Sequence, residues 1–407
     1  GNHSSEDSSI TFNKAVTSTS AGITLNDSTG DATVIFAADN SVDITGTING
    51  ASSGEGTIQV TGSTKTFKNT IGNSQPIAQL TIGGTTVFEA AVQTAALTTT
   101  AAISNSTTLS VSGVSNLGAN ITSSGTQTYT GAATLSANTV LTTSSEAVTF
   151  SNTVRSADST KRNLTINTGG NGTVVTFDGI VGGNSKSLGV IVITGALDLD
   201  AAITAATSLS VSGASNVGAD VTTTGTQTYS GSVTLSGGNR ILEGTTVATA
   251  ALNGGSSNLT VTGILDLNGA ITSTAVLSVS GASNLGANVT TSGTQTYTGA
   301  VTLSANAVLT SSDDNFAFSD AIDSDSSTRN LTLNPGSGTI AVSGAIGGEA
   351  LGTLTITQSG GTTFGGRVTA ATVTLTDTAD DADISFNAGI TIDTLNTTSE
   401  GYDINLY

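Results

Sequence analysis

The sequence of 407 residues contains no cysteine, methionine or tryptophan, and it has a single histidine. The absence of cysteine fits secreted bacterial proteins, which cross membranes unfolded. Because a serine nucleophile needs a base, the many serines identify no catalytic triad, and the lone His3 is expected to face solvent in a polar N-terminal segment. No run of about 18 apolar residues occurs, so no membrane-spanning helix is expected.

Charge is also scarce. Charged residues make up 10% of the chain, against about 25% in an ordinary domain. The 29 acidic residues outnumber the 10 basic ones, which gives a formal net charge of −19. This balance argues against a nucleic-acid partner, which requires a basic stripe, and against electrostatic docking to anionic lipid. We expect the negative charge mainly to keep a neutral surface dispersed in water.

The chain is rich in glycine, with 50 residues, and in serine, threonine, alanine, valine and asparagine, whereas proline occurs only twice. Disordered chains are poor in β-branched residues and rich in proline, glutamate and lysine. This sequence shows the opposite bias, and its valine, isoleucine and threonine favour strands. The composition therefore predicts a folded, all-β protein.

Long internal repeats organise the sequence. Three similar segments, each containing the phrase GTQTY, span Leu109–Ser144, Leu209–Glu243 and Leu277–Ser312. The first copy precedes the last by 168 residues and the middle copy precedes it by 68, and the middle copy lacks much of the sequence that follows the others. Units that can be added or dropped in this way are typical of a solenoid, in which each unit contacts only its neighbours.

Within the repeats, apolar and polar residues alternate. Val301 and Leu303 alternate with Thr302 and Ser304, which predicts a strand with the first pair buried and the second pair exposed. Glycine and asparagine separate such runs and supply the positive-φ positions that corners need. No helical periodicity with N-cap support is present.

The repeats decide between the possible all-β folds. A propeller would need a period of about 40–45 residues with aromatic blade motifs, but aromatic residues make up only 4% of the chain. The sequence predicts instead a rod-like parallel β-helix, or β-solenoid, with no substantial helix. We expect N-terminal coils with a polar leading tail over residues 1–70, a repeat-built solenoid over 71–376, and C-terminal coils with an uncapped edge over 377–407.

The tyrosine of the repeated phrase occupies one equivalent position in every copy. Tyr129, Tyr229 and Tyr297 each precede a glycine and a short apolar strand. Tyr297 shares the parity of the apolar residues that follow it. We therefore expect these tyrosines to point inward at coil corners and to set the strand register.

Two segments, IGGEALGTLTITQSGGTTFGGRV from Ile346 and TTSGTQTYTGAVTLSANAVLTSS from Thr290, resemble repeats of large bacterial surface exoproteins. These are the filamentous-haemagglutinin-like adhesins and related β-strand-repeat proteins. The resemblance covers about residues 71–376. It implies a right-handed parallel β-helix, an extracellular location at the bacterial cell surface, an adhesive or structural role, and glycans on host or neighbouring cells as partners. It brings no catalytic residues with it.

An enzymatic β-helix, such as a polysaccharide lyase or glycosidase, is the alternative. Glycoside hydrolysis needs two carboxylates held about 5–9.5 Å apart in a cleft. Two acidic clusters, at residues 313–325 and 377–383, could supply such carboxylates. Their only nearby aromatic residues are Phe316, Phe318 and Phe386, and we expect these to lie in the core. The sequence therefore favours a non-catalytic structural or adhesive protein without a cofactor.

The same acidic clusters are the best candidates for calcium sites, because calcium prefers hard oxygen ligands. The repeated glycine-rich calcium motif is absent, and solvated loop charge is the competing interpretation. The candidate ligands are Asp313, Asp314, Asp323, Asp325, Asp377, Asp380, Asp381 and Asp383.

The two ends of the sequence predict head-to-tail self-association. Solenoids normally carry polar caps over their open strand edges, whereas both ends here consist of alternating apolar residues. The predicted edges comprise Ile10 and Phe12 at one end, and Tyr402, Ile404, Leu406 and Tyr407 at the other. Such a contact does not close and propagates as a filament; an adhesin shaft excised from a longer chain is the alternative.

Overall fold

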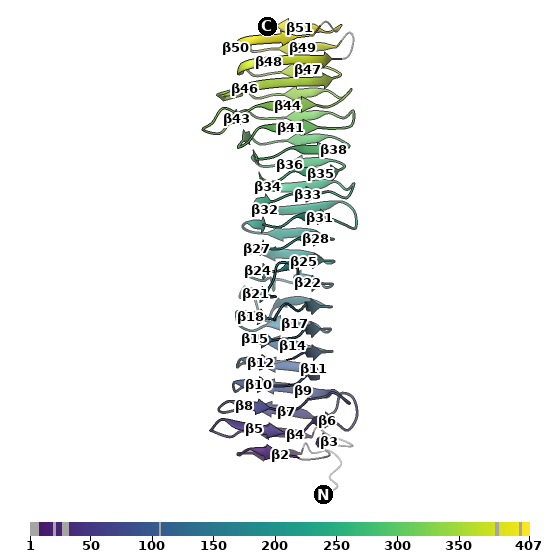
Figure 1. Ribbon diagram of the computed structural model, residues 1–407, viewed down its shortest axis with the longest axis vertical. Coiled ribbons are helices and arrows are strands. Elements are labelled where there is room, and N and C mark those ends of the chain that lie inside the picture. Colours follow the sequence, from purple (N-terminus) through teal and green to yellow (C-terminus); the bar gives the residue numbers. More distant parts are fainter. Residues whose placement is uncertain (1–7, 19–21, 27–31, 106, 379–381, 399–400) are drawn as a thin grey trace. The chain divides into compact units, whose positions relative to one another are not determined.

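The computed structural model describes residues 8–18, 22–26, 32–105, 107–378, 382–398 and 401–407. The chain divides into two compact units, residues 1–213 and 214–407. No helix occurs among the described residues, and every strand pairing within either unit is parallel (Figure 1). The predicted all-β parallel β-solenoid is therefore confirmed.

The coils of the first unit contribute strands to three columns, and most strands pair with their counterparts in the preceding and following coils. The first column contains β1 (Ser9–Phe12), β4 (Thr33–Phe36), β7 (Thr57–Val60), β9 (Ile77–Ile82), β11 (Val92–Thr99), β14 (Ser115–Leu117), β17 (Ala133–Leu135), β20 (Val154–Ser156), β23 (Val181–Gly182) and β26 (Ile203–Ala206).

The second column contains β2 (Val16–Thr17), β5 (Val42–Thr45), β8 (Lys65–Phe67), β10 (Thr86–Phe88), β12 (Ile103–Asn105), β15 (Ile121–Ser123), β18 (Thr139–Thr142), β21 (Leu164–Asn167), β24 (Val190–Thr194) and β27 (Ser208–Val211). The third contains β3 (Ile23–Leu25), β6 (Ile48–Gly50), the start of β11, β13 (Leu109–Val111), β16 (Gln127–Tyr129), β19 (Val148–Phe150), β22 (Val174–Phe177) and β25 (Ala196–Leu199).

The second unit repeats this arrangement. Its first column contains β28 (Ser215–Val217), β31 (Val233–Leu235), β33 (Leu252–Asn253), β35 (Ile271–Thr274), β38 (Val289–Thr291), β41 (Ala307–Thr310), β44 (Leu331–Asn334), β46 (Ile346–Ser359), β48 (Val368–Thr378) and β50 (Ile390–Thr397).

The second column of this unit contains β29 (Val221–Thr223), β32 (Arg240–Thr249), β34 (Leu259–Leu267), β36 (Leu277–Val279), β39 (Gln295–Tyr297), β42 (Phe316–Phe318), β45 (Ile340–Val342), β47 (Thr362–Phe364), β49 (Asp383–Phe386) and β51 (Asp403–Leu406). The third contains β30 (Gln227–Tyr229), β37 (Ser283–Leu285), β40 (Val301–Leu303) and β43 (Ile322–Ser324), together with parts of the long strands β32, β34, β46, β48 and β50.

The predicted strand parity is present in β40. Val301 and Leu303 are only 2% and 0% exposed, whereas Thr302 is exposed. Ser304 is only partly exposed, because it follows the strand and donates its backbone N–H to the carbonyl of Leu285 in the preceding coil. Valine, isoleucine and leucine fill corresponding inward positions throughout both units, which makes the coil interior the core.

Coil length varies without breaking this register. Leu109 pairs with Val92, 17 residues earlier, whereas Val175 pairs with Val148, 27 residues earlier. The extra residues of a longer coil lie in loops between columns, so the inward residues remain aligned. Coil pairing also continues across positions 70 and 376, where the predicted segment boundaries lie.

Aromatic side chains stack on one another inside the coils. The ring centroids of Tyr129 and Phe150 lie 4.9 Å apart, and those of Phe150 and Phe177 lie 5.3 Å apart. Aromatic pairs of this kind contribute about 0.5–1.5 kcal/mol beyond the area they bury. The predicted core positions of Phe316, Phe318 and Phe386 are confirmed, since all three are buried.

Candidate functional site

The repeated phrase GTQTY forms a buried hydrogen-bonded pair. In β16, the hydroxyl of Tyr129 donates to Oε1 of Gln127 over 3.0 Å, and both side chains are fully buried. The equivalent pairs are Tyr229 with Gln227, at 3.1 Å, and Tyr297 with Gln295, at 3.0 Å. The predicted inward orientation of the tyrosines is confirmed, although each ends a strand rather than filling a corner.

The glutamine completes this network by bonding the backbone of two coils. Nε2 of Gln295 donates to the Val289 carbonyl of its own coil and to the Thr310 carbonyl of the next coil, at 3.4 and 2.9 Å. A buried polar group without a partner costs about 1–3 kcal/mol, so a complete network is required here. The glutamine was not among the residues predicted to matter, although it recurs two residues before every repeated tyrosine.

Burial raises the pKa of the Tyr129, Tyr229 and Tyr297 hydroxyls well above the ordinary tyrosine value. These groups therefore remain neutral donors at physiological pH. With their hydroxyls directed to glutamine inside the core, they are inaccessible to a ligand at the surface. The repeated phrase thus has a structural role.

Asparagine side chains link successive coils at their corners. Oδ1 of Asn163 accepts the backbone N–H of Val190, and Oδ1 of Asn138 accepts the N–H of Asn163, each over 2.9 Å. The second unit repeats this geometry, with Asn330 accepting from Thr353. These side chains satisfy backbone donors that the strands leave unpaired at a corner.

A buried lysine in the first unit closes a corner in another way. Nζ of Lys65 donates to the carbonyls of Ala38 and Thr61, at 2.8 and 3.0 Å, and to that of Ser63. The side chain is completely buried, and this burial lowers the pKa of Lys65, with Asp39 opposing the shift. Lys65 shares the inward parity of Phe67 in β8, but its burial was not among the predictions from the sequence, because a lysine is ordinarily exposed.

Several predicted calcium ligands already have protein partners. Oδ1 of Asp313 accepts the backbone N–H of Ser337 at 2.9 Å, and Oδ1 of Asp323 accepts that of Glu349 at 3.3 Å. Asp325 forms a bidentate ion pair with Arg329, with N–O distances of 2.9 and 2.7 Å. The Arg329 guanidinium, together with a backbone N–H, holds the pKa of the Asp325 carboxyl below its usual range.

The structure describes only some of the remaining candidates. Asp314 is partly exposed, and Asp383 is exposed on β49, where it pairs in register with Asp403. Asp380 and Asp381 lie outside the described residues, and the side chain of Asp377 is not described. Among the described residues, no group of three or more histidine, cysteine, aspartate or glutamate side chains is arranged to hold a metal ion. The calcium sites stay a prediction.

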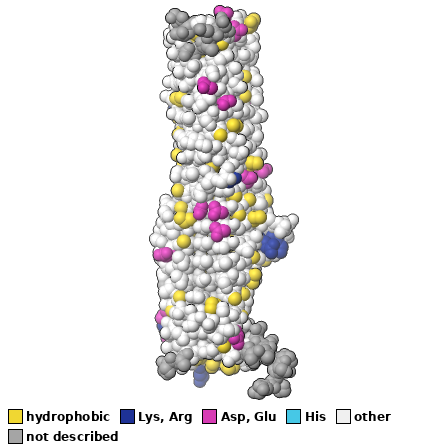
Figure 2. Space-filling model, turned by 90° about the vertical axis from the view of Figure 1, so that its right-hand side faces the viewer, with side chains coloured by type: hydrophobic (Ala, Val, Ile, Leu, Met, Phe, Trp, Pro, Cys, Tyr) yellow, Lys and Arg dark blue, Asp and Glu magenta, His cyan; other side chains and the backbone are white. Residues whose placement is uncertain are grey.

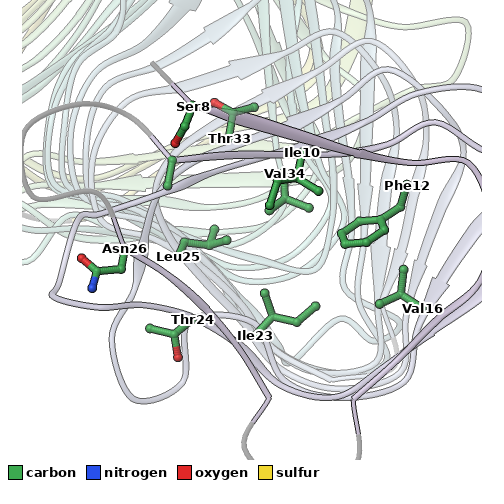
Figure 3. Close-up of a pocket in the computed structure, with 11 residues that line it drawn as sticks. Ser8, Ile10, Phe12, Val16, Ile23, Thr24, Leu25, Asn26, Thr33 and Val34 are labelled. Carbon is green, nitrogen blue, oxygen red and sulfur yellow. The ribbon is translucent and has the colours of Figure 1, made fainter. Parts of the chain in front are cut away.

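The first described coil carries an apolar hollow of about 240 Å³. Its lining includes Ile10 and Phe12 of β1, Val16 of β2, and Ile23 and Leu25 of β3, whose side chains converge in Figure 3. None of the described residues that line it carries a carboxylate or other ionisable group. Among the described residues, this mainly apolar lining is an uncovered part of the core.

The predicted edge residues lie over the core at the outermost described coils. Ile10 pairs in register with buried Val34, and Leu406 pairs with buried Phe386, yet they are 58% and 63% exposed. Tyr402 differs, because its hydroxyl donates to the carbonyl of Leu375 in the preceding coil and so is directed away from the open edge. Tyr407 follows β51 and is exposed, whereas Ile404 is partly exposed above Ile384.

On the face shown in Figure 2, charged and apolar side chains are scattered among side chains that are neither. His3 lies outside the described residues. No helix capable of spanning a membrane occurs in the part of the chain that the structure describes. No protein-family model, curated protein or solved structure matches this chain. The resemblance to filamentous-haemagglutinin-like adhesins therefore stays a prediction.

Proposed function

We propose that this chain is a non-catalytic, extracellular structural or adhesive protein of a bacterial surface. The observation that carries the proposal is the role of its repeated polar residues. The repeated glutamine and tyrosine bond to each other and to backbone inside the coils, and the repeated asparagines bond the next coil. These repeated residues therefore serve the stacking of coils, which supports a role in providing a regular, stacked surface.

We further propose that another coil of the same kind covers the apolar edges of the outermost coils. Strands β1, β2 and β3 each have a described partner on one side only, and β50 and β51 are in the same position. The exposed Ile10 and Leu406 lie directly above buried residues, where an additional coil would cover them. That coil belongs either to a second copy in a filament or to the continuing shaft of a longer adhesin.

Surface labelling tests the proposed location and role. Antibodies raised against the purified chain should label intact, unpermeabilised cells of the source bacterium, and deletion of the gene should reduce cell attachment or remove surface fibres. Labelling only after permeabilisation would overturn the proposal. Release of reducing or unsaturated sugars from polysaccharide by the purified chain would instead support the enzymatic alternative.

End stacking has a separate test. If copies stack end to end, the purified chain should form filaments visible by electron microscopy, and Ile404→Lys should abolish this end-to-end stacking. Wild-type protein that remains monomeric at high concentration would exclude the filament and leave the shaft.

A further inference from the structure

Two corners of the solenoid, one in each unit, share a common backbone framework. In the first unit, Ser156 Oγ donates to the carbonyl of Ser187 and accepts the N–H of Arg162, at 2.8 and 3.0 Å. In the second, Ser324 Oγ donates to the carbonyl of Ala350 and accepts the N–H of Arg329, at 3.3 and 3.1 Å.

Further contacts extend this equivalence. Gly189 donates its N–H to the carbonyl of Arg162, as Gly352 does to that of Arg329. The strands beside these corners also pair alike, through Val154 with Val181 in the first unit and Ile322 with Ile346 in the second. The two corners therefore correspond residue by residue, with three extra residues in the loops of the first unit.

The matched positions carry opposite charges. Arg155 occupies the position of Asp323, because each immediately precedes the bridging serine. Lys186 occupies the position of Glu349. The bridging serines donate to the carbonyls of Ser187 and Ala350, and Lys186 and Glu349 immediately precede these two residues. Lys161 is an additional cation in the first unit, where the loop is one residue longer.

Each corner also contains an internal ion pair that leaves its remaining charges available. Arg162 lies 3.4 Å from Asp158 in the first unit, and Arg329 lies 2.7 Å from Asp325 in the second. We name Arg155, Lys161 and Lys186 the basic corner, and Asp323 and Glu349 the acidic corner. None of these five side chains forms an ion pair with another described residue.

The basic corner is unusual for this protein. Four of the ten cationic residues in the chain fall between positions 155 and 186, although the formal net charge is −19. Nε of Arg155 is buried without a hydrogen-bond partner among the described residues. A cluster of cations of this kind favours binding of an anionic partner. The acidic corner is anionic, and it has the same backbone framework.

We propose that the basic corner of one copy binds the acidic corner of a second copy, so that solenoids associate side by side. The pairing brings Arg155, Lys161 and Lys186 against Asp323 and Glu349, and the matching frameworks place each set on a similar surface. Because every copy carries both corners, each copy can bind two neighbours, and the contact propagates. This contact deepens the proposed structural role, but it uses different residues from the coil edges, so either contact can fail alone.

Charge reversal in two matched variants tests this contact. Arg155→Asp/Lys186→Glu makes both corners acidic, and Asp323→Arg/Glu349→Lys makes both corners basic. Each variant alone should self-associate at least about tenfold more weakly than the wild type, because like charges then face each other. An equimolar mixture of the two variants should recover association, and so should the four-substitution chain. Sedimentation and light scattering measure the effect, and circular dichroism verifies folding.

The control changes net charge by the same amount elsewhere. Lys14→Glu/Arg367→Glu alters two exposed cations outside the basic corner and should associate as the wild type does. Raising the salt concentration should weaken wild-type association, because exposed ion pairs are screened over about 8 Å at 0.15 M ionic strength.

Failure of the mixture to recover association would overturn the proposal, as would a monomeric wild type at low salt. Association that Ile404→Lys abolishes but corner reversal leaves unchanged would overturn it while leaving end stacking intact. If Arg155→Asp/Lys186→Glu removes binding to an immobilised polyuronate but not self-association, the partner is an anionic glycan and the proposal is wrong.

Discussion

The hydroxyl of Tyr297 donates to Oε1 of Gln295, two residues earlier in the same strand, over 3.0 Å. Residues two apart in a strand share a face, so both side chains enter the core. Nε2 of the same glutamine reaches the Thr310 carbonyl of the next coil at 2.9 Å. One pair of side chains therefore joins a strand to the coil stacked on it, and the chain uses this arrangement three times.

Tyr297→Phe should lower the free energy of unfolding by about 1–3 kcal/mol, because Oε1 of Gln295 is then buried without a donor. The outward-facing neighbour provides the control, and Thr296→Ala should change stability by less than about 0.5 kcal/mol. Urea denaturation measures both. Equal losses from the two substitutions would contradict the described pairing.

Strong alkali should destabilise the protein through its buried tyrosines. Because the folded-state pKa of Tyr129, Tyr229 and Tyr297 is raised, the unfolded chain loses these protons first. Stability is unaffected below about pH 10 and falls above it, by about 1.4 kcal/mol per pH unit for each tyrosine. Each Tyr→Phe substitution should reduce the fall in stability with pH by about 1.4 kcal/mol per pH unit. Denaturation at several pH values measures this change. An unchanged slope would show that the substituted tyrosine ionises in the fold.

Lys65→Met should destabilise the first unit, since the carbonyls of Ala38, Thr61 and Ser63 lose a shared donor. Leaving buried acceptors unpaired costs about 1–3 kcal/mol. Because burial lowers the pKa of Lys65, its amine is protonated in the unfolded chain at pH values where it is already neutral in the folded protein. Wild-type stability should therefore rise with pH between the folded-state pKa and the ordinary value of 10.5, and the variant should lack this rise. Hydrogen exchange of β8 locates the effect, and unchanged protection there would contradict it.

Inward and outward positions of β40 should respond very differently to substitution. Leu303→Asp places an unpaired charge in the core and should cost more than about 4 kcal/mol, whereas Thr302→Asn should cost less than about 1 kcal/mol. A neutral residue is the right control at position 302, because Thr302 pairs in register with Asp323. Thermal unfolding measures both variants, and similar losses would mean that the register is wrong.

Removal of divalent cations should leave the melting temperature unchanged. Asp313, Asp323 and Asp325 accept hydrogen bonds from protein groups, and Asp325 also forms an ion pair. A metal ion would have to displace these contacts. The measurement is thermal unfolding with EDTA and then with added calcium. A drop of several degrees that calcium restores would establish a calcium site.

Much of the fold could be predicted because its determinants are local. The alternation around Val301 and Leu303 predicts their burial, since a strand places every second side chain on one face. The tyrosines could likewise be assigned to the interior from their parity with the next strand. The role of Gln295 could not be predicted, because its partner at Thr310 becomes a neighbour only when the following coil is in place.

The partners of the candidate site residues were harder to predict than the strands, because they depend on how the coils stack. The sequence places Asp323 and Asp325 two residues apart and suggests one shared ion site. In the structure, Asp323 instead accepts from Glu349 in the next coil, while Asp325 pairs with Arg329 in its own loop. Neither partner can be chosen from sequence spacing, because loop lengths decide which residues meet at a corner.

Three features can be read from the sequence without the structure: the all-β class, the inward and outward faces of the strands, and the repetition of one stacking unit. These follow from a period of two and from repeated segments, which are properties of neighbouring residues. Only the tertiary structure decided that Lys65 is buried under three carbonyls, that Asn330 bonds the next coil, and that Arg155 and Asp323 occupy equivalent corners. These relationships depend on contacts between successive coils, such as Lys65 with Ala38 and Asn330 with Thr353, and those contacts exist only because each coil is held in parallel register on the one before it.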